Sequence, residues 1–278
     1  MQFFNHYSSA WLLGLAFALL ATGLVAGVLA GMLGVGGGIV IVPVLYHLFT
    51  LLGIDESVRM HVTVGTSLAT IIPTSIMSSR AHRMRGSLDA EVLKQLMPGV
   101  IVGVLVGSIA SGFLSGHVLT VVFATMALLV ALNMVLKGDG FAIADGLPGP
   151  AGTALLGGGI GGVSTLMGIG GGTLSVPILS ALRMPMHTAV GTGAMLGMLI
   201  SFPGAVAFIL NGWGEPNRPP FSIGYVNLLG FALIVPATMA TSGWGAKLAH
   251  SINAKRLRQM FAAFLALTAA RMFYGLLT

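Results

Sequence analysis

Two glycine clusters are the residues of this sequence whose type and spacing best suit chemistry. They run from Gly34 to Gly38 and from Gly168 to Gly172, and each interrupts an apolar stretch. We expect a helix to restart after each cluster, at Ile39 and at Thr173, because glycine lets the backbone unwind. A helix N-terminus presents free N–H groups and about half a positive charge, so two such termini would form an anion site without a basic side chain. The candidate binding groups are Gly36, Gly37, Gly38, Gly170, Gly171, Gly172 and Thr173.

The glycine clusters also have a simpler explanation, because small residues let membrane helices cross closely. Nucleotide-binding loops are a poor match, since neither cluster has a phosphate-loop lysine or the glycine spacing of a dinucleotide fold. Unwound backbone at membrane depth is tolerated only inside protein or beside a wet cavity. Short glycine-interrupted segments at equivalent places in two halves therefore favour the binding site of a transporter, with close packing as the alternative.

Three hydroxyl residues could add donors to such a site. Thr66, Ser67 and Thr192 lie just inside the apolar segments that follow the two glycine-broken stretches. Each hydroxyl could instead donate to a carbonyl of its own helix, which is the commoner arrangement.

Four other polar residues are candidates with a stronger structural alternative. His61 and His187 lie at predicted membrane edges, where a capping or interfacial contact is more usual than a transport role. His47 could relay a proton or be a partnered buried histidine. Arg271, in the last apolar stretch, could attract an anion or extend its side chain to the membrane surface.

All seven acidic residues fall in predicted loops, and they are Asp55, Glu56, Asp89, Glu91, Asp139, Asp145 and Glu215. Cation pumps usually use a carboxylate inside the membrane, whereas a buried carboxylate would repel an anion. Any coupling ion, a proton or sodium, would need hydroxyl and carbonyl ligands. With no cysteine and no clustered histidines at ligand spacing, we expect no metal site, no cofactor and no enzymatic activity.

The composition places these residues in a membrane. Of the 278 residues, 55% are hydrophobic and 7% are charged, and the mean hydropathy is +0.96; a soluble domain carries about a quarter charged residues. The net charge of +6 comes from short loops, so it indicates topology rather than nucleic-acid binding. The stretch 11–33 is too long for the core of a signal peptide, so we treat it as a membrane segment of the mature protein.

The apolar stretches form two related halves, 1–140 and 141–278. Gly34–Pro43 matches Gly168–Pro177, and His61–Thr66 matches His187–Thr192 in the same order. Each half has five apolar stretches, and they cover 11–33, 39–52, 61–79, 93–115 and 118–136, then 150–167, 173–182, 188–210, 222–247 and 257–277. An internal repeat of this length is typical of duplicated transporters.

Loop charges indicate that the two halves are inverted. Residues 80–85 are strongly basic and should be cytoplasmic, whereas the equivalent loop 212–220 is nearly neutral. Conversely, residues 255–258 are basic and their counterpart near His117 is not. We therefore expect an all-α polytopic membrane protein of two inverted repeats, each with a glycine-broken helical hairpin and with both termini outside. The loop charges leave open whether the hairpins span the membrane or re-enter it.

The sequence resembles the TauE/SafE family of sulfite and sulfonate exporters over nearly its full length. The resemblance rests on the repeated motif at 34–43 and 168–177, on 64–67 and 190–192, and on the stretch from Ala81 to Gly86 and on to Gly99. It implies a bacterial inner-membrane permease for a small sulfur-containing anion such as sulfite, sulfoacetate or another organosulfonate. One departure is that Thr192-Gly193 stands where the first half has Thr66-Ser67, so hydroxyl donors would be asymmetric.

The leading hypothesis is a secondary transporter that works by alternating access, with the anion between the two glycine breaks. An anion-selective channel, or a transporter of a non-sulfur organic anion, is the alternative. The expected partners are the lipid bilayer, the organosulfur anion and, where transport is ion-coupled, a proton or sodium ion. A homodimer is compatible with the sequence, and nucleic acid is not an expected partner.

Overall fold

The structure, a computed structural model, describes residues 9–33, 36–136, 144–248 and 254–277. Ten helices and one two-stranded hairpin make up this part of the chain. In the first half the helices are α1 (Ser9–Leu33), α2 (Gly38–Leu51), α3 (Glu56–Arg83), α4 (Ala90–Phe113) and α5 (Gly116–Leu136). In the second they are α6 (Pro150–Met167), α7 (Gly172–Ala181), α8 (Met186–Asn211), α9 (Leu228–Leu248) and α10 (Ala254–Leu277). The expected helical segments are confirmed.

The helix boundaries follow from local chemistry. The side chain of Asp55 accepts the backbone N–H of Ser57 before α3, and that of Asp89 accepts the N–H groups of Glu91 and Val92 before α4. Such caps satisfy amides that have no partner within the helix. Gly168 ends α6 in the left-handed conformation, with φ 67°. At the start of α2, Gly37 has φ 79°, an angle that favours glycine.

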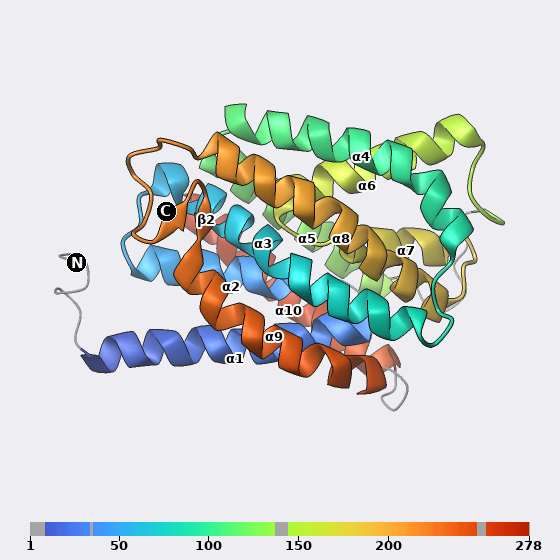
Figure 1. The fold of residues 1–278 in the computed structure, drawn as a ribbon, viewed down its shortest axis with the longest axis horizontal. Coiled ribbons are helices and arrows are strands. Elements are labelled where there is room, and N and C mark those ends of the chain that lie inside the picture. Colours follow the sequence, from blue (N-terminus) through green and yellow to red (C-terminus); the bar gives the residue numbers. More distant parts are fainter. Residues whose placement is uncertain (1–8, 34–35, 137–143, 249–253, 278) are drawn as a thin grey trace.

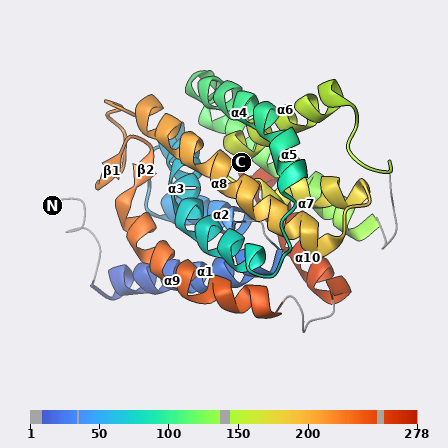
Figure 2. The same ribbon diagram turned by 45° about the vertical axis from the view of Figure 1, so that its right-hand side comes forward.

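The helices form layers around a central pair. Helices α3 and α8 pack against each other in the middle, α4 and α6 lie on one side, and α1 and α9 lie on the other (Figures 1 and 2). Helices α5 and α10 pack together behind the central pair (Figure 1). The central pair is the best shielded, and the side chains of α3 are buried without a break from Met60 to Ile71.

Both glycine-broken hairpins return to the side where they start. The end of α2 lies beside the start of α9, at the same end of the molecule as the start of α1 (Figure 1). After α7, Arg183 pairs with Asp145, which precedes α6, with its Nε 2.7 Å from the carboxylate. With 14 and 10 residues, α2 and α7 are about 21 and 15 Å long, shorter than the roughly 30 Å of a bilayer core. The two short helices are thus the return arms of hairpins whose first arms, α1 and α6, have 25 and 18 residues.

Two equivalent close contacts join the first half to the second. Helix α4 packs closely on α6, and α9 packs closely on α1. Glycines make both contacts close. A Cβ atom added to Gly103 would overlap the Gly158 carbonyl, and one added to Gly245 would overlap the Val28 carbonyl. Because α1 corresponds to α6 and α4 to α9, these contacts are equivalent in the two halves.

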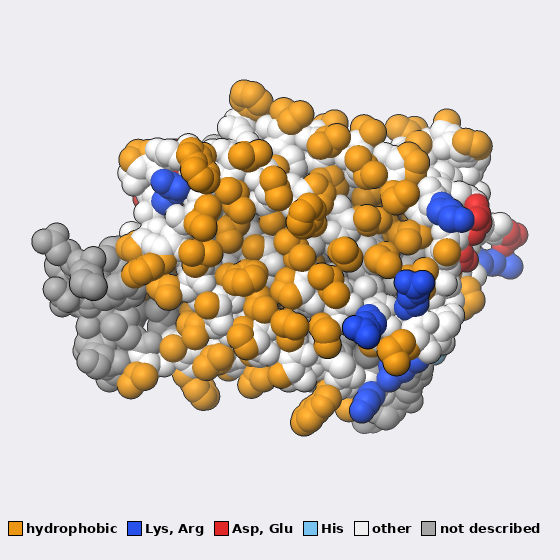
Figure 3. All heavy atoms as spheres, in the orientation of Figure 1, with side chains coloured by type: hydrophobic (Ala, Val, Ile, Leu, Met, Phe, Trp, Pro, Cys, Tyr) orange, Lys and Arg blue, Asp and Glu red, His pale blue; other side chains and the backbone are white. Residues whose placement is uncertain are grey.

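The outer surface is suited to lipid. Figure 3 shows apolar side chains across the middle of the molecule, while Lys and Arg gather at one end. Five of the described helices are long and apolar enough to cross a bilayer, and they are α3, α4, α5, α8 and α9. An apolar belt with charged ends is expected when the bilayer is the solvent. The expectation of an all-α polytopic membrane protein is thus confirmed.

Two details differ from the sequence expectation. The stretch 222–247 begins with a small hairpin, in which β1 (Ser222–Ile223) pairs with β2 (Val226–Asn227), and only then continues as α9. Glu56 and Glu91 lie in the first turns of α3 and α4 rather than in loops. A helix N-terminus stabilises a negative charge, which accounts for both positions. Asp139 lies outside the described residues.

Candidate functional site

The two glycine breaks touch each other. A Cβ atom on Gly38 would lie 2.7 Å from the carbonyl oxygen of Gly168 and 3.0 Å from the Cα of Ile169. A Cβ atom on Gly36 would lie 3.6 Å from the Cα of Gly170. The chain therefore brings Gly36, Gly38 and Gly170 together, with the start of α2 against the end of α6 and the turn before α7. We call this contact the glycine junction.

The glycine junction lies at mid-height on the central helices. On α3 it contacts the turns from Ser67 to Ser75. The junction also contacts α8. A Cβ added to Gly171 would lie 3.0 Å from the Cβ of Leu196 and 2.7 Å from the δ-methyl of Ile200. Gly193 of α8 lies beside the Cα of Gly172. These turns are about halfway along each helix. Gly37 lies apart from the junction, since a Cβ there would face the Ala26 carbonyl of α1.

Neutral donors surround the junction. Helix α7 begins at Gly172, and the amides of Gly170, Gly171 and Gly172 donate to no described residue. Three nearby hydroxyls, those of Ser75, Thr173 and Ser175, are at least 98% buried and have no described hydrogen-bond partner. Buried polar groups are normally hydrogen-bonded. Donors without partners at the start of a helix, here α7, are groups from which an anion site can be built.

Ser67 ties the two halves together at the junction. Its hydroxyl donates to the carbonyl oxygen of Gly168 at 2.7 Å. The equivalent residue in the second half is Gly193, where the hydroxyl comes from a different helix: a Cβ on Gly193 would lie 2.9 Å from the Ser175 Oγ. The Ser175 hydroxyl of α7 therefore lies where the second half lacks a counterpart to Ser67, but it makes no described hydrogen bond.

The two equivalent threonines of the repeat hold the connecting segments at opposite ends of the central pair. The hydroxyl of Thr66 accepts the backbone N–H of Asn227 at 2.8 Å, and that of Thr192 accepts the N–H of Asp89 at 3.2 Å. Asn227 and Asp89 each cap the following helix through their side chains. We call these two equivalent bonds the threonine latches. A solute-binding role for these threonines stays a prediction.

A glycine beside each threonine lets the latch close. A Cβ on Gly65 would lie 2.5 Å from the carbonyl oxygen of Tyr225, and a Cβ on Gly191 would overlap the carbonyl of Ser87. The hairpin after α8 thus rests on the start of α3, and the loop after α3 rests on the start of α8. It follows that α3 and α8 run antiparallel. Burial raises the pKa of Tyr225, so this phenol stays neutral at physiological pH.

The remaining polar candidates lie away from the junction. His61 is buried, its Nε2 lies 3.0 Å from the Leu114 carbonyl oxygen, and its ring packs 4.9 Å from that of Tyr225. His187 and Arg271 are exposed, and His47 is half-buried. No group of three or more His, Asp or Glu residues in the described chain is placed to hold a metal ion.

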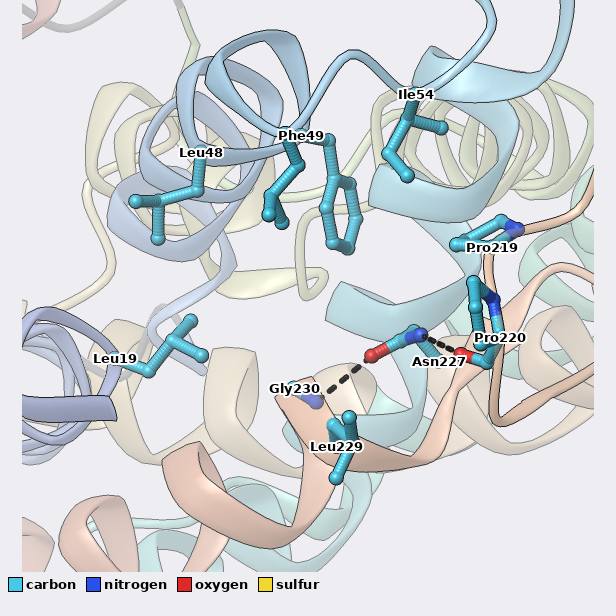
Figure 4. A pocket seen from close by; sticks show the side chains of 10 residues that line it. Leu19, Leu48, Phe49, Ile54, Pro219, Pro220, Asn227, Leu229 and Gly230 are labelled. Atoms are coloured by element: carbon cyan, nitrogen blue, oxygen red, sulfur yellow. Dashed lines mark hydrogen bonds between the residues drawn. The ribbon is translucent and has the colours of Figure 1, made fainter. Parts of the chain in front are cut away.

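An apolar cavity of about 50 Å³ lies near the Thr66 latch, between α1, α2 and the hairpin (Figure 4). Asn227 is its polar residue, and both ends of the side-chain amide are used: Oδ1 accepts the N–H of Gly230, and Nδ2 donates to the Pro220 carbonyl. With its polar atoms satisfied, this cavity is no anion site.

Sequence reasoning missed Ser75, Ser175 and Ser201. Ser201 is also fully buried without a described partner. The repeat held a usable signal, because Ser75 follows Thr66 by nine residues and Ser201 follows Thr192 by nine. No comparable signal marks Ser175, whose counterpart is Ile41.

The described helices and their apolar belt define an all-α polytopic membrane protein. A family model described as sulfite exporter TauE/SafE matches residues 19–272, and the chain belongs to this family.

Curated relatives span nearly the same length. The chain is 34% identical to a probable membrane transporter protein of Haemophilus influenzae, over 91% of this chain and 96% of the relative. It is 28% identical to one of Bacillus subtilis, over 85% and 88% of the two chains, and 27% identical to one of Methanocaldococcus jannaschii, over 89% and 91%. No solved structure matches the chain.

Proposed function

We propose that this protein is a secondary transporter of a small sulfur-containing anion, such as sulfite, sulfoacetate or another organosulfonate. The observation that carries the proposal is the glycine junction, where the two glycine breaks meet beside the start of α7 and its buried donors. The description of the family supports sulfite as the first anion to test.

The charge distribution also favours an anion. The six described acidic residues lie in loops, at N-caps or in first turns, away from the junction. Two unit charges 4 Å apart interact by about 4 kcal/mol near a protein surface, so a carboxylate at the junction would exclude an anionic solute. Amides and hydroxyls attract the anion without holding it as tightly as an arginine would, and release is needed for turnover.

Alternating access between inverted halves would follow from the symmetry of the central pair. The equivalent helices α3 and α8 run antiparallel, and each end of the pair is closed by one threonine latch. Residues of the junction are buried. In this mechanism, opening one latch exposes the site to one side while the other latch stays closed. The two halves would be 1–140 and 141–278.

The proposed orientation follows from the loop charges. Arg80, Arg83 and Arg85 lie at the end of α3 and in the loop after it, at the end of the molecule where basic side chains gather. Basic loops stay on the cytoplasmic side. This end would face the cytoplasm of a bacterial cell, and the β1–β2 hairpin would face the opposite side of the inner membrane.

The test is anion flux in proteoliposomes of the purified protein. We expect saturable uptake of sulfite or sulfoacetate, and accelerated exchange when unlabelled anion is placed inside. Taurine and acetate serve as comparison solutes. A folded protein that carries none of the sulfur anions would remove the substrate assignment, and flux that never saturates would indicate a channel instead.

A further inference from the structure

Two buried serines on the central helices occupy equivalent positions in the repeat. Ser75 lies on α3 and Ser201 on α8, both are fully buried, and neither hydroxyl has a described hydrogen-bond partner. An unpartnered buried hydroxyl is unfavourable in a folded protein. Two of them at equivalent positions, one from each half, call for a ligand that supplies the missing acceptors.

Ser75 points into the glycine junction. A Cβ atom on Gly197 would lie 2.7 Å from the Ser75 Oγ and 3.9 Å from the backbone nitrogen of Gly171. A Cβ atom on Gly36 would lie 3.3 Å from the same hydroxyl. The Ser75 hydroxyl and the Gly171 amide thus both lie beside Gly197, close enough for one small ligand to contact the two.

Ser201 lies on the face of α8 that packs against α3. Gly197, one turn before Ser201, faces Ser75. One turn after Ser201, a Cβ added to Gly204 would lie 3.2 Å from a δ-methyl of Leu68. Residues spaced by three and four share one face of a helix. Ser201 is therefore held between these two contacts, at the crossing of the central pair.

We propose that the Ser75 and Ser201 hydroxyls donate hydrogen bonds to the oxygen atoms of one bound oxyanion, in the sulfur case to its SO₃ group. This assignment rests on the proposed transport function and names the side chains that carry its specificity. An oxyanion offers several acceptors in different directions, so it can accept from both halves at once. Its release then requires α3 and α8 to separate on one side.

The first experiment measures ligand-induced thermal stabilisation of purified protein with sulfite, sulfoacetate, nitrate, formate and chloride. The variants are Ser75→Ala and Ser201→Ala. The control is Ser108→Ala on α4, which removes another buried hydroxyl without a described partner. We expect each site variant to bind the stabilising anion at least tenfold more weakly, while Ser108→Ala binds as the wild type does.

A second readout separates ligand binding from a structural role. Without ligand, Ser75→Ala and Ser201→Ala should unfold at or above the wild-type temperature, because each removes an unsatisfied buried group. A lower unfolding temperature without ligand, with unchanged affinity, would assign the serines a structural role and overturn the inference.

The outcomes separate the two proposals. If sulfite stabilises the wild type and both serine variants equally, the serine assignment fails and the transport function stands. If only nitrate or formate stabilises the wild type, the sulfur assignment fails and the serines are judged on that anion. If no anion of the panel stabilises the wild type, both proposals fail.

Discussion

At the scale of single residues, the absence of a side chain at Gly38 decides whether the two glycine breaks can meet. The backbone of the second break occupies the space where a Cβ would be, 2.7 Å from the Gly168 oxygen. Backbone cannot move aside as a flexible side chain can. Any larger residue at position 38 must therefore push the two breaks apart.

We predict that Gly38→Ala lowers the initial rate of anion uptake at least tenfold, because the donors around the junction are displaced. Gly159→Ala on α6 is the matched control, since its added Cβ meets nothing within 4 Å and alanine favours a helix by about 1 kcal/mol over glycine. Uptake in proteoliposomes checks the prediction. Equal rates for the two variants would show that contact between the breaks is not needed.

At the scale of elements, the threonine latches fix how each connecting segment sits on the start of the opposite central helix. The Thr66 latch is buried and its bond is 2.8 Å long, whereas the Thr192 latch is partly buried and its bond is 3.2 Å long. Unpaired buried groups cost more than groups that water can reach. The two ends of the molecule should therefore differ in stability.

We predict that Thr66→Val destabilises the protein by about 1–3 kcal/mol, since it leaves the Asn227 amide without its acceptor. Thr192→Val should cost less. Faster amide hydrogen exchange in the β1–β2 hairpin would show that the Thr66 latch has loosened, and faster exchange in residues 84–89 would show the same for the Thr192 latch. Thr120→Val is the control, because that hydroxyl donates only to the Gly116 carbonyl of its own helix. An equal loss in the control would remove any special role of the latches.

At the scale of the whole molecule, the proposed inversion of the two halves predicts that loops at the two ends face opposite sides of the membrane. The chain has no cysteine, so single cysteines can be introduced without a background. Met84 is 81% exposed after α3, and Ala144 and Asn217 are exposed in loops. These positions are accessible to a reagent at each end of the fold.

We predict that Met84→Cys and Ala144→Cys react with an impermeant maleimide only from the cytoplasmic side, and Asn217→Cys only from the opposite side. Right-side-out and inverted vesicles, with the cysteine-free parent as background, provide the comparison. Labelling of all three from the same side would exclude the inverted topology.

The sequence by itself determined the membrane location, the helical segments and the two glycine breaks. These features depend on local properties: hydropathy sets which segments enter lipid, and glycine sets where a helix can be interrupted. The repeated motifs at 34–43 and 168–177 also identified the residues that form the junction. Such signals are short-range, so they can be read without knowing how the helices pack.

Only the tertiary structure decided which hydroxyls remain without partners. Thr66 and Thr192 accept amides from distant loops, Ser67 donates to Gly168, and Ser75 is left without a described partner. Sequence gives the type of each side chain, but the partner of a buried hydroxyl is set by how two helices cross. The contact between the two glycine breaks likewise depends on how α2 and α7 pack on the central helices, which no local property of the sequence sets.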